Sequence, residues 1–214
     1  HLLLDVVRDV LRVRALAHVA HAVLLEPERL HSALELAPGD LERCGLPAEG
    51  LVLSNPLAAE ESILRTSLLP GLVKAVAYNE SHRLPGAKLF ELGRVFELGE
   101  RGVITDVVES ELAGRVLSGE SEHLAAVLAG RDATAAVELV ELMLRSVGRW
   151  HAPASAGASL ARAEAGAARL EAATVPGLHP SRSALVVLGD VRVGEVGEVD
   201  PGVLDAHAIT ERIG

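Results

Sequence analysis

The stretch from Leu53 to Phe96 constrains the fold more than any other part of the chain. It opens with Ser54-Asn55-Pro56, a combination typical of a turn. Pro70 then stands before apolar residues at helical spacing, which predicts a helix from about 70 to 81. Residues 89–98 alternate between two faces and predict a strand. A turn, a helix and a strand in this order indicate a fold that mixes α and β structure.

Further helices and strands are expected around this stretch. Apolar residues at helical spacing predict helices at 2–14, 28–36, 134–147 and 201–206, and a helix start at 58–63, where Glu60 and Glu61 would lie near its positive end. Strands are predicted at 16–25, 51–53, 124–129 and 185–188, the last of these paired with 191–199 through a Gly189-Asp190 turn. Residues 102–119 receive no assignment, and the alanine-rich segment 152–173 allows a weak helix at 160–170.

Composition narrows the classes of function. With 214 residues and 49% hydrophobic content, we expect residues 1–214 to form a single domain. Aromatic residues make up 2% of the chain and the formal charge is −10, so binding of nucleic acid on aromatic platforms or by overall charge is not expected. One cysteine and the lack of a long uncharged apolar run predict a cytoplasmic protein with neither a disulfide nor a membrane span.

Arg65-Thr66-Ser67 is the first candidate site. A guanidinium with two neighbouring hydroxyls could hold a phosphate or a carboxylate. Alternatively, Arg65 pairs with Glu60, Glu61 or Glu91, and the hydroxyls cap the helix that follows. The sequence favours the second reading and leaves both open.

Catalytic and metal sites are not indicated. His18 and His21 would point to opposite faces of a strand, and no third zinc ligand stands nearby. A Gly-x-Ser-x-Gly elbow and a glycine-rich phosphate loop are both missing from the sequence. We therefore expect no catalytic residue, no metal and no cofactor in this chain.

Three blocks carry a resemblance to a known family. They are SNPLAAEESILRTSLLPGLVKAVAYN at 54–79, LFELGRVF at 89–96, and GLHP-SRSA at 177–184 followed by GEVGE at 194–198 and Pro201. In these residues and their order the chain resembles the synthetase-like core of phenylalanyl-tRNA synthetase beta subunits, over roughly its whole length. Departures include Ala20, Ala22 and Val23, where the family usually has aromatic residues.

The resemblance implies an α+β fold of the class II aminoacyl-tRNA synthetase type, an antiparallel sheet flanked by helices. It also implies a partner, the catalytic alpha subunit, with helix 2–14 at the interface and two alpha and two beta chains in the complex. Asn55, Arg65, Arg94, His179 and Arg182 become framework or interface candidates. The chain would be a fragment of a longer beta subunit, and the editing and anticodon-binding domains would lie outside it.

The same resemblance implies that this chain does not perform the chemistry. Arg94 lies on the strand where a class II synthetase carries the arginine that binds the ATP α-phosphate, but Val95-Phe96-Glu97 follows it and no Gly-Gly-Arg-like element occurs downstream. ATP, magnesium and tRNA(Phe) would then belong to the whole complex, a phenylalanine-tRNA ligase.

Two alternatives stay open. One is a synthetase-like paralogue that still binds ATP or an amino acid. The other is a free-standing tRNA-contact module that uses Arg8, Arg12, Arg14 and Arg182.

Overall fold

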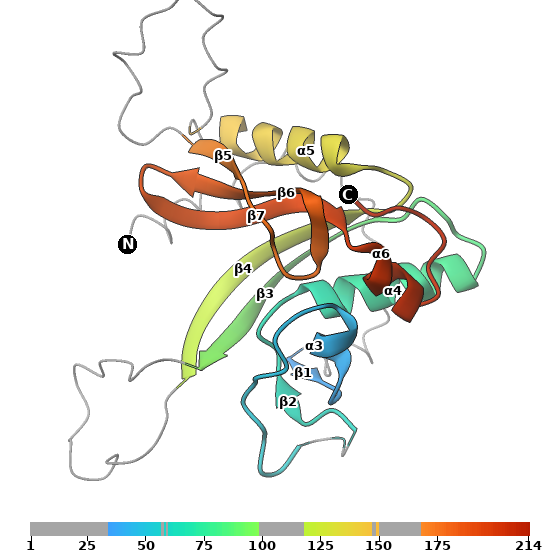
Figure 1. Cartoon of the computed structure of the whole chain (residues 1–214). Helices are drawn as coiled ribbons and strands as arrows, with labels where there is room; N and C mark the ends of the chain where they lie inside the picture. Colours follow the sequence, from blue (N-terminus) through green and yellow to red (C-terminus); the bar gives the residue numbers. More distant parts are fainter. Residues whose placement is uncertain (1–33, 57, 59, 99–117, 147–148, 150–167) are drawn as a thin grey trace, which may run out of the picture.

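The computed structural model describes residues 34–56, 58, 60–98, 118–146, 149 and 168–214 (Figure 1). The described elements, in chain order, are β1 (Glu35–Leu36), α3 (Asp40–Arg43), β2 (Ile63–Leu64), α4 (Leu69–Ser81), β3 (Lys88–Leu98), β4 (Ser118–Leu128), α5 (Ala133–Ser146), β5 (Ala168–Ala172), β6 (Leu178–Leu188), β7 (Val191–Val199) and α6 (Pro201–Ala206). The described residues contain both helices and antiparallel strands, so the predicted mixed fold with antiparallel pairing is confirmed.

The strands form three antiparallel sets, which are β1–β2, β3–β4 and β5–β6–β7. The last residues of the chain lie between two of them. The amide of Leu128 in β4 donates to the carbonyl of Gly214 at 2.9 Å, and the amide of Gly214 donates back at 3.2 Å. The amide of Val199 in β7 donates to Ile213 at 2.8 Å. Residues 213–214 therefore connect the β3–β4 hairpin to the three-stranded sheet.

Two apolar cores follow from this arrangement. In the first, α4 packs Leu72, Val73 and Val76 with Val127 of β4 and Ile213. In the second, α5 packs against β6 and β7, which it covers on one face (Figure 1). Residues of this second core include Ala136, Val137, Val140, Leu144, Val186 and Val196. The amphipathic patterns predicted for these helices are thus the faces that the sheets cover.

The C-terminal end of α3 contacts the turn that precedes β6. Gly177 has a φ of +80°, and a Cβ there would lie 2.6 Å from the carbonyl oxygen of Cys44. A side chain is excluded on both counts, so glycine allows the two backbones to meet. Cys44 itself is fully buried in the first core.

Most predicted elements in the described residues are confirmed. These are the helices at 70–81, 134–147 and 201–206, the strand at 89–98, the strand at 124–129, which begins earlier, and the hairpin around Gly189-Asp190. The predicted strand at 51–53 appears as a single bridge between Val52 and Ile63. The helix predicted at 2–14 and the strand at 16–25 lie outside the described residues.

Three local predictions are wrong. The helix expected at 28–36 is absent where it is described, since Glu35 and Leu36 form strand β1 and pair with Leu64 and Ile63, while residues 28–33 lie outside the described residues. The helix start expected at 58–63 is instead a turn followed by a strand, because the amide of Glu61 donates to the carbonyl of Ala58 and Ile63 enters β2. The weak helix at 160–170 fails where it can be seen, because Ala168 to Leu170 pair with β6. In each case long-range strand pairing overrides local propensity.

A buried ion cluster fixes α3 on α4. The Asp40 carboxylate is fully buried and accepts hydrogen bonds from Lys74, from Arg43 at 2.6 Å and from the amide of Ala37 at 2.9 Å. Burial alone raises the pKa of Asp40, but the hydrogen bond and charge of Lys74, the Ala37 amide and the Arg43 charge outweigh it. The pKa therefore lies below the ordinary value of 3.8.

We predict that Asp40→Asn lowers the free energy of unfolding by about 2–3 kcal/mol at pH 7, because Lys74 and Arg43 lose a shared charged acceptor. Since the folded pKa is depressed, this contribution is complete above the unfolded pKa and is lost as pH falls through the folded pKa. Urea denaturation should show a constant gap between wild type and variant from about pH 7 to 5 and a smaller gap below about pH 4. Glu42→Gln on the exposed side of α3 is the matched control, and an equal effect from it would contradict the prediction.

The single thiol provides a second test. Burial, and then the nearby Asp40 charge, raise the pKa of Cys44 to about 11. The reactive thiolate is therefore scarce at neutral pH as well as inaccessible. We predict that Ellman's reagent modifies Cys44 at least about 100-fold more slowly in the native protein than in urea at pH 8. Labelling at the same rate in both conditions would show that the α3–α4 contact is open.

Candidate functional site

Arg65 is the centre of the candidate site. Of the three carboxylates considered as its partner, Glu60, Glu61 and Glu91, the structure pairs it with Glu91. Its Nη1 lies 2.5 Å from Glu91 Oε1, and its Nε donates to the carbonyl of Arg94 at 2.7 Å. The backbone adds a further hydrogen bond between the two segments, which the amide of Phe96 donates to the carbonyl of Arg65 at 2.9 Å. The Arg65 side chain is only 6% exposed. Arg65 therefore attaches the segment after β2 to the edge of β3.

Gly93 makes room for this guanidinium. A Cβ at Gly93 would overlap the Nη2 atom of Arg65 and lie 3.1 Å from its Cζ. Within four residues of β3, Glu91 thus supplies a carboxylate, Gly93 leaves space, and Arg94 supplies a backbone carbonyl, all for the side chain of Arg65. This explains why a glycine stands inside a strand, where it otherwise weakens packing.

The first turn of α4 lies beside the same carboxylate. A Cβ at Gly71 would lie 3.7 Å from Oε2 of Glu91, and the Ser67 hydroxyl accepts from the amide of Leu69, the first residue of α4, at 3.1 Å. Helix N-termini and arginine both favour anions. Glu91 therefore occupies a position suited to an anion. The predicted capping by the hydroxyls is met only in part, because the N-cap residue is Leu68, which makes no side-chain capping bond, and Ser67 accepts one amide from the position before it.

Arg94 lies on the other face of the β3–β4 hairpin. Its side chain is 66% exposed and forms an ion pair with Glu120 of β4. The strand register places Glu122 directly opposite Arg94 and Leu124 opposite Leu92. On this face, Arg94 therefore has the carboxylates of Glu120 and Glu122 on one side and the apolar residues Leu92 and Leu124 on the other.

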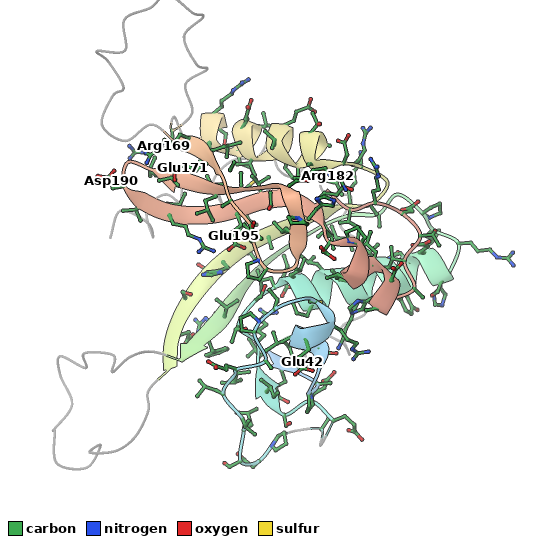
Figure 2. All side chains as sticks on the ribbon, in the orientation of Figure 1. Glu42, Arg169, Glu171, Arg182, Asp190 and Glu195 are labelled. Carbon is green, nitrogen blue, oxygen red and sulfur yellow. The ribbon has the colours of Figure 1, made fainter. Side chains whose placement is uncertain are left out.

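The remaining sequence candidates lie elsewhere. Asn55 is exposed in its turn and accepts a long 3.5 Å hydrogen bond from Ser54. His179 accepts from the amide of Ser181 at 3.2 Å. Figure 2 shows Arg182 at the end of β6 that lies away from Asp190. Arg65 contacts the backbone carbonyl of Arg94, and among the described residues no hydrogen bond or ion pair joins either arginine to the other three candidates.

Sequence reasoning missed the partner of Arg182. Glu198 of β7 is buried, and its Oε1 lies 3.0 Å from Nη2 of Arg182 and 3.7 Å from Nε of Arg212. Its Oε2 is buried without a hydrogen bond. Glu198 stands in the GEVGE block, but its pairing depends on the β6–β7 register, which has an irregularity between Leu178 and Ser183.

The described residues hold neither a cluster of metal ligands nor a membrane-spanning helix. Within the part of the chain that the structure describes, no group of three or more His, Cys, Asp or Glu side chains could hold a metal ion. His18 and His21 lie outside that part. Among the described helices, none is long and apolar enough to cross a membrane.

The fold defines the class of protein. A solved structure of a Desulfitobacterium hafniense pyrrolysyl-tRNA synthetase is similar to this chain with a TM-score of 0.59 at 16% identity, over 99% of this chain and 63% of that one. A second structure of that enzyme gives a TM-score of 0.56 at 15% identity, over 99% and 64%. The chain therefore has an aminoacyl-tRNA synthetase-like fold.

Sequence comparison then identifies the family. The family described as "Phenylalanyl tRNA synthetase beta chain CLM domain" matches residues 5–214. The phenylalanine–tRNA ligase beta subunit of Xanthomonas euvesicatoria pv. vesicatoria is 37% identical over 176 residues, and that of Rhodopseudomonas palustris 35% over 165. These matches cover 78% and 72% of this chain but 19% and 18% of the relatives. The chain belongs to this family, which confirms the resemblance.

The ion pair at the centre of the site can be tested by a double-mutant cycle. We predict that Glu91→Gln lowers the free energy of unfolding by about 3 kcal/mol, because it leaves the buried Arg65 guanidinium without its carboxylate. Arg65→Met combined with Glu91→Gln should cost less than the sum of the single changes, which chemical denaturation would measure. Arg145→Ala removes a pair in which Arg145 is 55% exposed and should cost under about 1 kcal/mol. Additive single changes would refute the coupling.

Proposed function

We propose that this chain is a non-catalytic, synthetase-like domain of a phenylalanine-tRNA ligase beta subunit. Its role is to assemble with the catalytic alpha subunit, in a complex of two alpha and two beta chains that aminoacylates tRNA(Phe). Membership of the beta chain family supports the parent complex. The chain spans about a fifth of the length of the relatives it matches.

The surroundings of Arg94 carry the non-catalytic part of the proposal. In a class II synthetase an arginine on this strand binds the α-phosphate of ATP. Here Arg94 already pairs with Glu120 and has Glu122 opposite it across the hairpin. A phosphate would have to displace one carboxylate and tolerate the other, and repulsion between like charges opposes both.

The rest of that hairpin face offers little to a nucleotide. Phe90 pairs with Ala126 and Leu92 with Leu124, so aliphatic and aromatic carbon follows Arg94 toward the start of β3. Phe90 is 44% exposed. These side chains carry no donor for phosphate or ribose oxygens, and they suit contact with protein better. ATP and magnesium are therefore assigned to the alpha subunit of the complex.

Assembly is the direct test. The chain mixed with a phenylalanine-tRNA ligase alpha subunit should elute with it in size-exclusion chromatography, whereas the chain alone should form no phenylalanyl-tRNA. Co-elution is expected because a domain that has lost the ATP contacts can contribute through its interface. Separate elution of the two proteins at micromolar concentration would refute the assembly role.

Calorimetry separates the alternative function. Titration of the chain with ATP, magnesium and phenylalanine should release no heat of binding, because Glu120 holds Arg94. A saturable heat that Arg94→Ala removes would instead establish a synthetase-like protein that retains nucleotide binding. Glu120→Gln is the informative companion, since it frees Arg94 and leaves the hairpin register in place.

A further inference from the structure

The β3–β4 hairpin has one face covered by α4 and one open face. The covered face carries Leu89, Ala125 and Val127, which pack with α4 in the first core. Side chains alternate between the two faces of a strand, and the register of the hairpin pairs even-numbered residues with even-numbered residues. Each such pair forms one row of the open face. The described side chains of the open face are Lys88, Phe90, Leu92, Arg94 and Phe96 of β3 and Glu120, Glu122, Leu124, Ala126 and Leu128 of β4.

The middle of the open face is apolar. One row pairs Phe90 with Ala126, and the next row pairs Leu92 with Leu124, so two successive rows carry no charge. Phe90 is 44% exposed, and Ala126 beside it is exposed as well. Leu92 and Leu124 are half-buried. Apolar side chains gathered at the centre of an uncovered sheet face favour a protein partner that removes them from water.

Opposite charges flank the apolar middle. Lys88 lies one row before Phe90, is exposed, and forms no ion pair within the part of the chain that the structure describes. Glu122 lies one row beyond the apolar middle and is also exposed. Its neighbour Arg94 pairs with Glu120, which leaves Glu122 without an ion pair among the described residues. One end of the open face therefore has an excess of positive charge, and the other has an excess of negative charge.

The order of the rows makes the open face self-complementary. Two copies can pack open face to open face with their strands antiparallel. The Phe90 row of each copy then covers the Leu92 row of the other, and Lys88 of each reaches the row that holds Glu122 of the other. Packed sheets lie about 10 Å apart, which a lysine and a glutamate can span together. A two-fold symmetric interface requires this kind of self-complementarity.

We propose that the open face binds the open face of a second copy of this chain, in a two-fold symmetric dimer. The inference goes beyond the proposed function and does not depend on it. A second copy supplies by symmetry what the face lacks, which is an apolar cover for its middle rows and a carboxylate for Lys88. The interface is only two strands wide, so we expect a weak dimer with a dissociation constant of roughly 10–100 µM.

Sedimentation equilibrium of the chain from about 1 to 200 µM measures the dimer. Wild type should pass from monomer towards dimer across this range. Phe90→Asp should stay monomeric at the highest concentration, because it places a charge among the apolar rows. Val191→Asp is the matched control, since it alters a 57% exposed residue of β7 outside the open face. Its dissociation constant should stay within about 3-fold of that of wild type.

A charge exchange tests the contact between Lys88 and Glu122. Lys88→Glu puts two acids at each contact and Glu122→Lys puts two lysines there, so each variant alone should dimerise about 10-fold or more weakly than wild type. An equal mixture of the two variants should recover to within about 3-fold of wild type, because every contact then joins opposite charges. Within one copy the two residues lie about 20 Å apart along the hairpin, so recovery requires contact between copies. Arg83→Glu, an equal charge change outside the open face, should leave the dimer unchanged.

The outcomes separate the dimer from the assembly role. A wild-type chain that stays monomeric at about 200 µM would overturn the dimer and leave the assembly role untouched. A dimer that Phe90→Asp does not weaken, or a mixture of the charge variants that does not recover, would show that the open faces do not meet. If Phe90→Asp weakens binding to the alpha subunit while the chain alone is monomeric, the open face belongs to that subunit instead. Slow labelling of Cys44 reports that each variant is folded.

Discussion

The hydrogen bonds of the last two residues hold the architecture together. Gly214 exchanges two backbone hydrogen bonds with Leu128 of β4, and Ile213 accepts one from Val199 of β7. Ile213 is also fully buried in the core under α4. Two separate antiparallel sets, each with its own helix, thereby share a backbone connection and an apolar residue. Without this connection, the β3–β4 hairpin and the three-stranded sheet would be joined by side-chain packing and their linking segments.

Buried charges add specificity to this packing. Asp40 draws Lys74 onto α3, Arg65 draws Glu91 and the carbonyl of Arg94 onto the segment after β2, and Glu198 faces Arg182 across two strands. The first two pairs join segments that are far apart in sequence, and the third joins the two strands of one hairpin. Apolar contacts tolerate small shifts between elements, whereas a buried charge tolerates few partners. In this chain the charged pairs therefore fix how the elements register on one another.

How well each part of the fold can be predicted depends on how far apart in the sequence its interacting residues lie. Helix α4 and the hairpin at Gly189-Asp190 depend on periodicity and turn chemistry within a few residues, and the sequence predicts both. Strand β2 forms because residues 64 and 63 pair with 35 and 36, which are distant in sequence. Local propensity does not reveal this pairing, and it predicted a helix start there instead. In the site, Glu91 could be named among three candidates for Arg65. Glu198 could not, because it meets Arg182 through a strand register that contains an irregularity.

The burial of Cys44 affects how quickly native protein is lost during storage. Its side chain is fully buried in the core with Leu72, Val73 and Val76 of α4, so an oxidant meets it only in molecules that have opened. Two opened molecules can then be linked by a disulfide between their Cys44 thiols, and neither sulfur can return to the core until a reductant breaks the link. Ageing in air would therefore remove molecules at the rate at which they open, although the free energy of the native state is unchanged. Storage life then depends on opening kinetics and on reductant, rather than on equilibrium stability alone.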